Sequence, residues 1–155
     1  MRLMRFFLLS VLAVSLVAGA VSAGASVGSS TAIATFKTPT RNIVCLYTSG
    51  GGQKPAIECG IKSKLKPRPS RRGPGCNHLD YVGDRVDLLS TGKAKPVSCA
   101  GDAGPFVYLN RARVLAYGKT WHKGPIWCSS QPSGLTCTNP QGHGFFLSRA
   151  RWVGF

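Results

Sequence analysis

The apolar residues of this 155-residue chain stand in short runs, and no segment repeats them at the spacing of an amphipathic helix. The runs are rich in β-branched and aromatic residues, and 19 glycines and 10 prolines separate them. This pattern is typical of an all-β protein. We expect strands over residues 42–48, 56–62, 84–90, 96–100, 111–118, 125–130, 135–139 and 145–153.

Two stretches, residues 42–61 and 125–139, share a plan that predicts β-hairpins. In both, an apolar run leads to a cysteine, a turn rich in glycine, proline, serine or glutamine follows, and a second cysteine stands in the next run. We therefore expect a small antiparallel β-barrel or sandwich, built from hairpins and stapled by disulfides.

The six cysteines favour disulfides over a metal site, because no two are close enough to form the paired knuckle of a zinc site. An even number of cysteines in a small exported chain is typical of a disulfide framework. Six cysteines allow many connectivities, and the hairpin spacing favours the local pairs Cys45–Cys59, Cys76–Cys99 and Cys128–Cys137. We expect no metal and no cofactor.

The first residues have the layout of a secretory signal peptide. The basic "MRLMR" precedes the apolar "FFLLSVLAVSLV", and "VSA" places small residues at the cleavage positions before residue 24. The apolar run is too short to cross a bilayer. We predict a signal peptide at 1–23, a flexible leader at 24–35 and one disulfide-bonded β domain at 36–155. The processed protein is expected to be secreted, monomeric and without a membrane span.

The charge balance predicts an anionic partner. The chain has a net charge of +15, and removal of Arg2 and Arg5 with the signal peptide leaves 18 basic and 5 acidic residues, a net +13. A balance of this kind attracts anionic surfaces and polymers and says nothing about the fold. The competing interpretation is that the excess positive charge only keeps the protein soluble.

Two basic features are candidate binding sites. In "KSKLKPRPSRR", residues 62–72, the alternation of cations in an extended chain would place every second one on the same side, about 6.6 Å apart. Two "RAR" triplets would each place two arginines on one strand face, and in a barrel the two strands could be neighbours. The candidate residues are Lys62, Lys64, Lys66, Arg68, Arg71, Arg72, Arg111, Arg113, Arg149 and Arg151. A charged loop that protects a sheet edge is the alternative interpretation.

Aromatic side chains add possible stacking surface. Trp121, Trp127 and Trp152 are candidates for stacking on bases or sugars, although Trp127 stands beside Cys128 and is expected in the core. The sequence has no nucleic-acid recognition motif, so any binding to nucleic acid is expected to be unspecific.

His143, between two glycines in "GHGFF", is interpreted as a turn residue rather than a catalytic group. A catalytic histidine needs a second titratable group across the substrate, and His78, His122 and Glu58 are the available partners. The sequence lacks the "GxSxG" motif of serine hydrolases, and paired cysteines leave no free thiolate. No residue is therefore assigned a catalytic role.

Several motifs together resemble a known family. "FKTPTRNIVC" (36–45), "CAGD" (99–102), "LAYG" (115–118), "SGLTCTN" (133–139) and "GHGFFLSR" (142–149) are similar in order to a family of small secreted actinobacterial proteins classified only as a domain of unknown function. The resemblance implies secretion and a cysteine-bonded domain. It implies no activity.

The leading hypothesis is a secreted binding module whose basic surface associates with anionic envelope polymer, nucleic acid or an acidic partner. A small basic hydrolase of ribonuclease type, using histidine as acid and base, is the alternative from the enzyme class. An inhibitor or toxin that acts on a protein is the third possibility.

Overall fold

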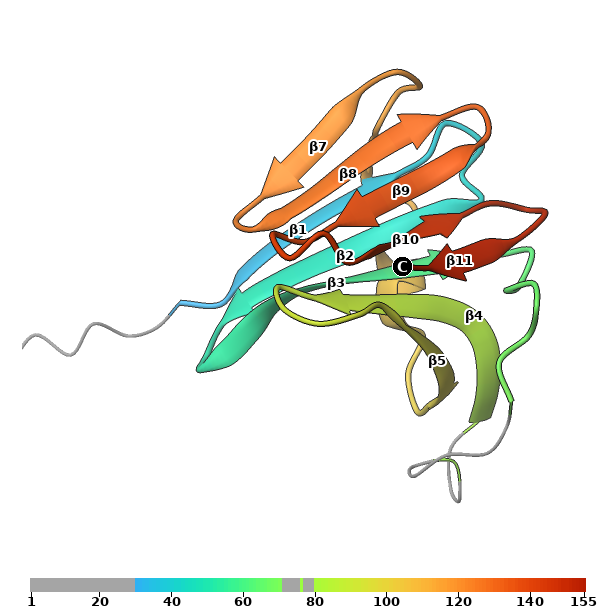
Figure 1. Ribbon diagram of the computed structural model, residues 1–155, viewed down its shortest axis with the longest axis horizontal. Coiled ribbons are helices and arrows are strands. Elements are labelled where there is room, and N and C mark those ends of the chain that lie inside the picture. Colours follow the sequence, from blue (N-terminus) through green and yellow to red (C-terminus); the bar gives the residue numbers. More distant parts are fainter. Residues whose placement is uncertain (1–29, 71–75, 77–79) are drawn as a thin grey trace, which may run out of the picture.

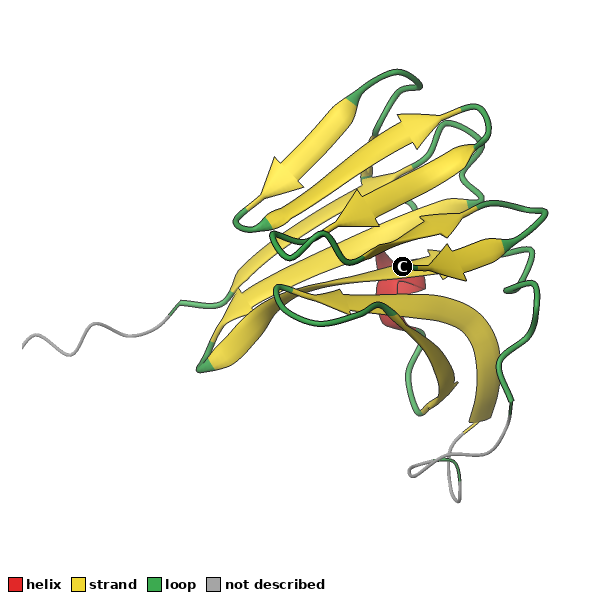
Figure 2. Cartoon of the chain, viewed as in Figure 1, coloured by secondary structure: helices red, strands yellow, loops and turns green. Residues whose placement is uncertain are grey.

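The computed structural model describes residues 30–70, 76 and 80–155. Two antiparallel-rich sheets face each other, with the orange-to-red strands laid over the blue-to-green ones in Figure 1. The sheets do not close into a barrel, so of the two predicted architectures, a barrel or a sandwich, the sandwich is correct. Within the described residues the chain is nearly all strand and loop, with one short 3₁₀ helix behind the sheets (Figure 2).

The six-stranded sheet has the order β5-β4-β3-β2-β1-β6. Its strands are β1 (Ala32–Lys37), β2 (Ile43–Gly50), β3 (Gln53–Ile61), β4 (Asp80–Leu89), β5 (Lys95–Ala100) and β6 (Arg113–Val114). All neighbours pair antiparallel except β1 and β6, which are parallel. The 3₁₀ helix η1 (Gly104–Tyr108) packs on β2 and β3.

The five-stranded sheet has the order β11-β10-β9-β8-β7, with every pair antiparallel. Its strands are β7 (Thr120–Lys123), β8 (Ile126–Gln131), β9 (Gly134–Thr138), β10 (Gly144–Leu147) and β11 (Trp152–Gly154).

All three predicted disulfides are confirmed: Cys45–Cys59, Cys76–Cys99 and Cys128–Cys137. Cys45 lies directly opposite Cys59 in the β2–β3 register, and Cys128 lies directly opposite Cys137 in the β8–β9 register. The two similar hairpins of the sequence therefore form the centres of the two sheets. Three intramolecular disulfides are typical of extracellular proteins.

The core lies between the sheets because alternate strand residues point to opposite faces. On β3, Ile57, Cys59 and Ile61 are fully buried, and they face buried residues of β8, β9 and β10. The ring of Trp121 on β7 packs between the sheets, 4.9 Å from Phe36 and 5.9 Å from Tyr47. Two aromatic contacts thus join the edge of one sheet to β1 and β2 of the other.

Two of the predicted strands are wrong in part. The expected strand at 145–153 is two strands, because Ser148 closes a turn: its backbone N–H and hydroxyl both donate to the carbonyl of Arg151, and the hydroxyl accepts from the N–H of Arg151. The expected strand at 111–118 shrinks to β6, because the N–H groups of Arg111 and Ala112 bond to Tyr108 in a turn after η1.

The predicted leader is also wrong at its end. Strand β1 begins at Ala32, inside the expected leader 24–35, and pairs along its whole length with β2. The signal peptide at 1–23 and the first part of the leader lie outside the described residues, as do Arg71, Arg72 and His78. No helix in the described part of the chain has the length and apolar character to cross a membrane.

Candidate functional site

Three cationic segments meet at one end of the sandwich. They are the β1–β2 turn, the segment after β3 and the β10–β11 turn, all on the right in Figure 1. We call this surface the basic end, and its exposed cations are Arg41, Lys62, Lys66, Arg68, Arg149 and Arg151.

Hydrogen bonds between the segments hold the basic end together. The N–H of Lys62 donates to the carbonyl of Asn42 (2.9 Å), which joins the segment after β3 to the β1–β2 turn. The N–H of Trp152 donates to the carbonyl of Lys66 (2.9 Å), and its indole N–H donates to the carbonyl of Pro67 (2.9 Å). Trp152 follows the β10–β11 turn directly, so these bonds place Arg151 beside the segment of Lys66.

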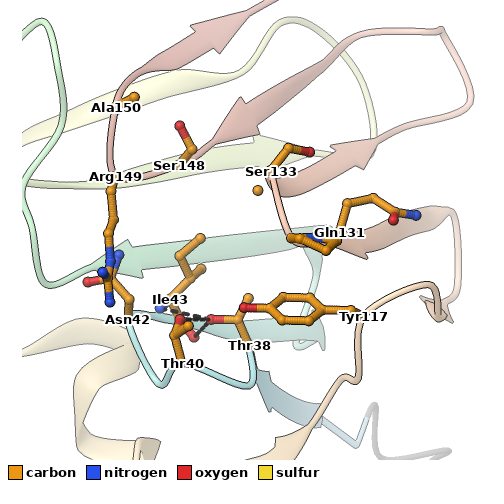
Figure 3. Close-up of a pocket in the computed structure, with 12 residues that line it drawn as sticks. Thr38, Thr40, Asn42, Ile43, Tyr117, Gln131, Ser133, Ser148, Arg149 and Ala150 are labelled. Atoms are coloured by element: carbon orange, nitrogen blue, oxygen red, sulfur yellow. Dashed lines mark hydrogen bonds between the residues drawn. The ribbon is translucent and has the colours of Figure 1, made fainter.

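A groove of about 280 Å³ opens at the basic end. Figure 3 shows that its walls come from four loops, with the side chain of Arg149 extending toward Asn42 and the ring of Tyr117 lying beside Thr38. Seven of its twelve described lining residues carry a hydroxyl or amide group, and Arg149 is the one charged residue among them. The lining residues are Thr38, Thr40, Asn42, Ile43, Tyr117, Gln131, Pro132, Ser133, Gly134, Ser148, Arg149 and Ala150.

Some of these polar side chains make hydrogen bonds within the protein, and others are free to bond a ligand. Thr38 exchanges hydrogen bonds with the backbone of Ile43 through its hydroxyl, and Ser148 closes its own turn. By contrast, the side chains of Tyr117, Gln131 and Arg149 make no hydrogen bond within the part of the chain that the structure describes. A ligand could therefore bind them without breaking a bond of the native fold.

Sequence reasoning missed the contribution of Arg41 and Tyr117 to this end. The stretch "KTPTRN" (37–42) contains the available signal, since a proline among polar residues between two apolar runs predicts a turn that would expose its cation. Tyr117 offered no such signal, because its place depends on how the β6–β7 connection crosses the sandwich.

The predicted row of alternating cations is wrong. Lys64 has a positive φ of 66° in a turn and bonds Asp84 (2.7 Å) and the carbonyl of Val82 (3.3 Å) through its ammonium group. Its ammonium group is therefore engaged with Asp84 and Val82 and does not continue a row of free cations. Lys62, Lys66 and Arg68 remain exposed, while Leu65 is buried and anchors the segment to the core.

The predicted four-arginine patch is also wrong. Arg113 belongs to β6, at the edge of the six-stranded sheet, whereas Arg149 and Arg151 belong to a turn of the other sheet. Arg111 lies in the turn after η1 and is not on the strand. The guanidinium of Arg151 lies over the ring of Phe146, 5.6 Å from its centroid.

The acidic residues gather around one buried cation. The guanidinium of Arg85 is 2% exposed and bonds Glu58 (3.0 Å) and the carboxylate and carbonyl of Asp102 (both 2.7 Å). Asp84 lies 3.7 Å from the same group and also binds Lys64. Burial lowers the pKa of Arg85, but its hydrogen bonds to Asp102 and Glu58 outweigh this and raise it.

Asp87 adds an unusual carboxyl to this cluster. It lies directly opposite Glu58 in the β3–β4 register. Burial first, and the charge of Glu58 second, raise the pKa of Asp87 to about 7, although Arg85 opposes the shift. In contrast, the hydrogen bond from Arg85 holds the pKa of Asp102 below its ordinary value. The described His, Cys, Asp and Glu residues include no trio placed to hold a metal ion.

His143 lies in the β9–β10 loop, which Asn139 organises. The buried Asn139 accepts backbone N–H groups of Gln141 and His143 through its side-chain oxygen and donates to the carbonyls of Leu89 and Gly92. Gly142 has the positive φ (77°) expected of a turn. Gly144 does not; it is glycine because a Cβ there would collide with the carbonyl of Cys137 and the ring of Phe155.

His122 and Glu58, one of the pairs that the enzyme alternative offered, do not come together. Glu58 alternates with core residues of β3 and so points outward from the six-stranded sheet. His122 follows the core-packed Trp121 and points outward from the five-stranded sheet, stacked on Trp127. The two side chains therefore lie on opposite outer faces of the sandwich and cannot act on one substrate.

Comparison with the profiles of known protein families identifies the family of this chain. The profile of a family described as "Family of unknown function (DUF6636)" matches residues 8–155. The chain belongs to the DUF6636 family. This confirms the resemblance to an uncharacterised domain that the order of motifs indicated. No curated protein and no solved structure matches this DUF6636 chain.

Proposed function

We propose that this DUF6636 protein is an exported binding module that holds an anionic polymer against its basic end. The observation that carries the proposal is the convergence of cations from three segments at one end of the sandwich, which also holds a groove lined by Arg149 and by no described acidic residue. Secretion is part of the proposal and is supported by the three disulfides and by the signal-peptide pattern of the first 23 residues.

The distribution of ion pairs supports this proposal. In the described residues, all four ion pairs involve Arg85 or Lys64. Glu58, Asp84 and Asp102 are therefore engaged with these two cations, and no described ion pair includes an exposed cation of the basic end. Exposed cations of one sign raise the local concentration of an anionic polymer and its association rate.

The groove would contribute recognition in addition to charge. The guanidinium of Arg149 can form paired hydrogen bonds with a phosphate, sulfate or carboxylate. Tyr117 and Gln131 are placed to meet the uncharged part of the same repeating unit. The groove volume of about 280 Å³ is close to the lower end of ligand-pocket volumes, roughly 300 Å³, and so suits a ligand of about one such unit.

Removing three charges from the basic end tests the proposal. The variant carries Lys62→Ser, Lys66→Ser and Arg149→Ser, all at exposed positions. We expect its affinity for heparin, measured by titration calorimetry at low ionic strength, to fall at least tenfold. Exposed substitutions of this kind leave the free energy of unfolding within about 0.5 kcal/mol each.

The matched control removes three exposed lysines at the other end of the strands, Lys54, Lys93 and Lys123, and thereby makes the same change in net charge. We expect this control to lose less than threefold in affinity. Equal losses in the two variants would show that only net charge matters and would contradict a site at the basic end.

A further inference from the structure

The outer face of the five-stranded sheet carries a second surface of different chemistry. Trp127 was expected in the core beside Cys128, and this expectation is wrong: its side chain is 54% exposed. The reason is strand alternation, because Ile126 and Cys128 point into the core and the residue between them must point out.

The exposed indole is held in a fixed orientation. Its ring stacks on the ring of His122, with centroids 4.5 Å apart and planes inclined by 15°. The two residues lie directly opposite each other in the β7–β8 register, where cross-strand side chains are in contact. A fixed aromatic ring loses little conformational entropy when a ligand binds to it.

Four hydroxyl-bearing residues lie beside this ring on the same sheet face. Thr120, Ser129 and Thr136 form one row across β7, β8 and β9, and Thr138 lies opposite Trp127 in the next row. Adjacent strands are about 4.8 Å apart, so the hydroxyl-bearing residues of this row follow one another at about that spacing. None of these four side chains makes a hydrogen bond within the described residues.

A shallow hollow of about 240 Å³ lies at this place. It is lined by Trp127, Cys128 and the four hydroxyl residues, and no charged side chain of the described residues contributes to it. An indole wall beside uncharged donors and acceptors suits a ligand that has an apolar face and many hydroxyls.

We infer that this surface, the Trp127 platform (Thr120, Trp127, Ser129, Thr136 and Thr138), binds a neutral sugar unit. The C–H face of the sugar would pack on the free side of the indole, and its hydroxyls would bond the threonine and serine side chains. A single-stranded nucleic acid could also stack on an indole, but the hollow offers no cation for its phosphates. The inference does not depend on the basic end.

The experiment uses tryptophan fluorescence of the full protein titrated separately with maltoheptaose, cellohexaose and chitohexaose. We expect at least one of them to change the emission with saturation, and Trp127→Ala to abolish that change. The Thr136→Val, Thr138→Val double variant keeps side-chain shape and β propensity but removes two hydroxyls, so its affinity should fall about tenfold. The matched control is Thr35→Val on the outward face of β1, which should bind normally.

Three outcomes would overturn the inference. One is the absence of any saturable change with all three saccharides. Another is tight binding of an oligonucleotide that depends on Trp127, which would assign the platform to bases. The third is self-association, seen by sedimentation velocity and abolished by Trp127→Ala, which would make the platform a contact between two copies. Heparin binding through the basic end should be the same in Trp127→Ala, so the two proposals fail separately.

Discussion

Asp87 provides a quantitative test of the structure through pH. The pKa of this carboxyl is raised from 3.8 to about 7 by burial and by the facing charge of Glu58. When the pKa of a carboxyl is higher in the folded than in the unfolded protein, its contribution to stability is fully present below the unfolded-state pKa. This contribution is lost as the pH rises through the folded-state pKa. Ionised Asp87 is therefore destabilising above about pH 7.

The magnitude follows from the difference between the two pKa values. A difference of about 3 units, at about 1.36 kcal/mol for each, gives at most about 4 kcal/mol. Asp87 is not fully buried, so solvent screening offsets part of this penalty. We therefore expect ionisation of Asp87 to lower the free energy of unfolding by about 2–4 kcal/mol between pH 4 and pH 8.

Asp87→Asn removes the charge and keeps the shape of the side chain. Urea unfolding with intact disulfides should give nearly equal free energies for the variant and the unaltered protein at pH 4. At pH 8 the variant should be more stable by about 2–4 kcal/mol. Glu58→Gln, which removes the facing charge, should move the pH window of the Asp87 effect downward. A difference between Asp87→Asn and the unaltered protein that does not vary with pH would refute the reasoning.

Three further predictions concern the stability of the folded domain, and each is measured by urea unfolding. Asn139→Ala removes the side chain that joins the β9–β10 loop to Leu89, and should cost about 2–3 kcal/mol because buried backbone groups lose their partners. His143→Asn should change stability by less than about 1 kcal/mol, since within the described residues His143 bonds the loop only through its backbone; a larger loss would mean that its imidazole supports the fold. Replacing both Cys128 and Cys137 by serine should cost about 2–3 kcal/mol, and no loss would mean that the link does not restrict the unfolded chain.

The features that could be predicted from sequence are local. The disulfide pairs were predictable because Cys128 and Cys137 flank a short turn with strand-forming residues on both sides, and opposite positions of a hairpin are within bonding distance. The turn at 148–151 was not, because it contains no glycine or proline and is closed by the hydroxyl of Ser148.

The features that could not be predicted depend on tertiary contacts. The basic end exists because Trp152 bonds the segment of Lys66, about 85 positions away in the chain. Spacing alone could not show that Lys64 turns toward Asp84 and leaves the expected row. The exposure of Trp127 was predictable in principle, since a residue between two core positions of a strand must face outward.

The salt dependence of polyanion binding tests the central claim most directly. The affinity of the full protein for an unstructured oligothymidylate would be measured between 50 and 200 mM salt, for the unaltered protein and for Lys62→Ser, Lys66→Ser, Arg149→Ser. If four cations of the basic end contact the strand, the slope of log K against log salt should be about −3, and the triple variant should flatten it to about −1. A protein that shows no salt-dependent binding, or a slope that the triple variant leaves unchanged, would contradict the basic end as the binding site.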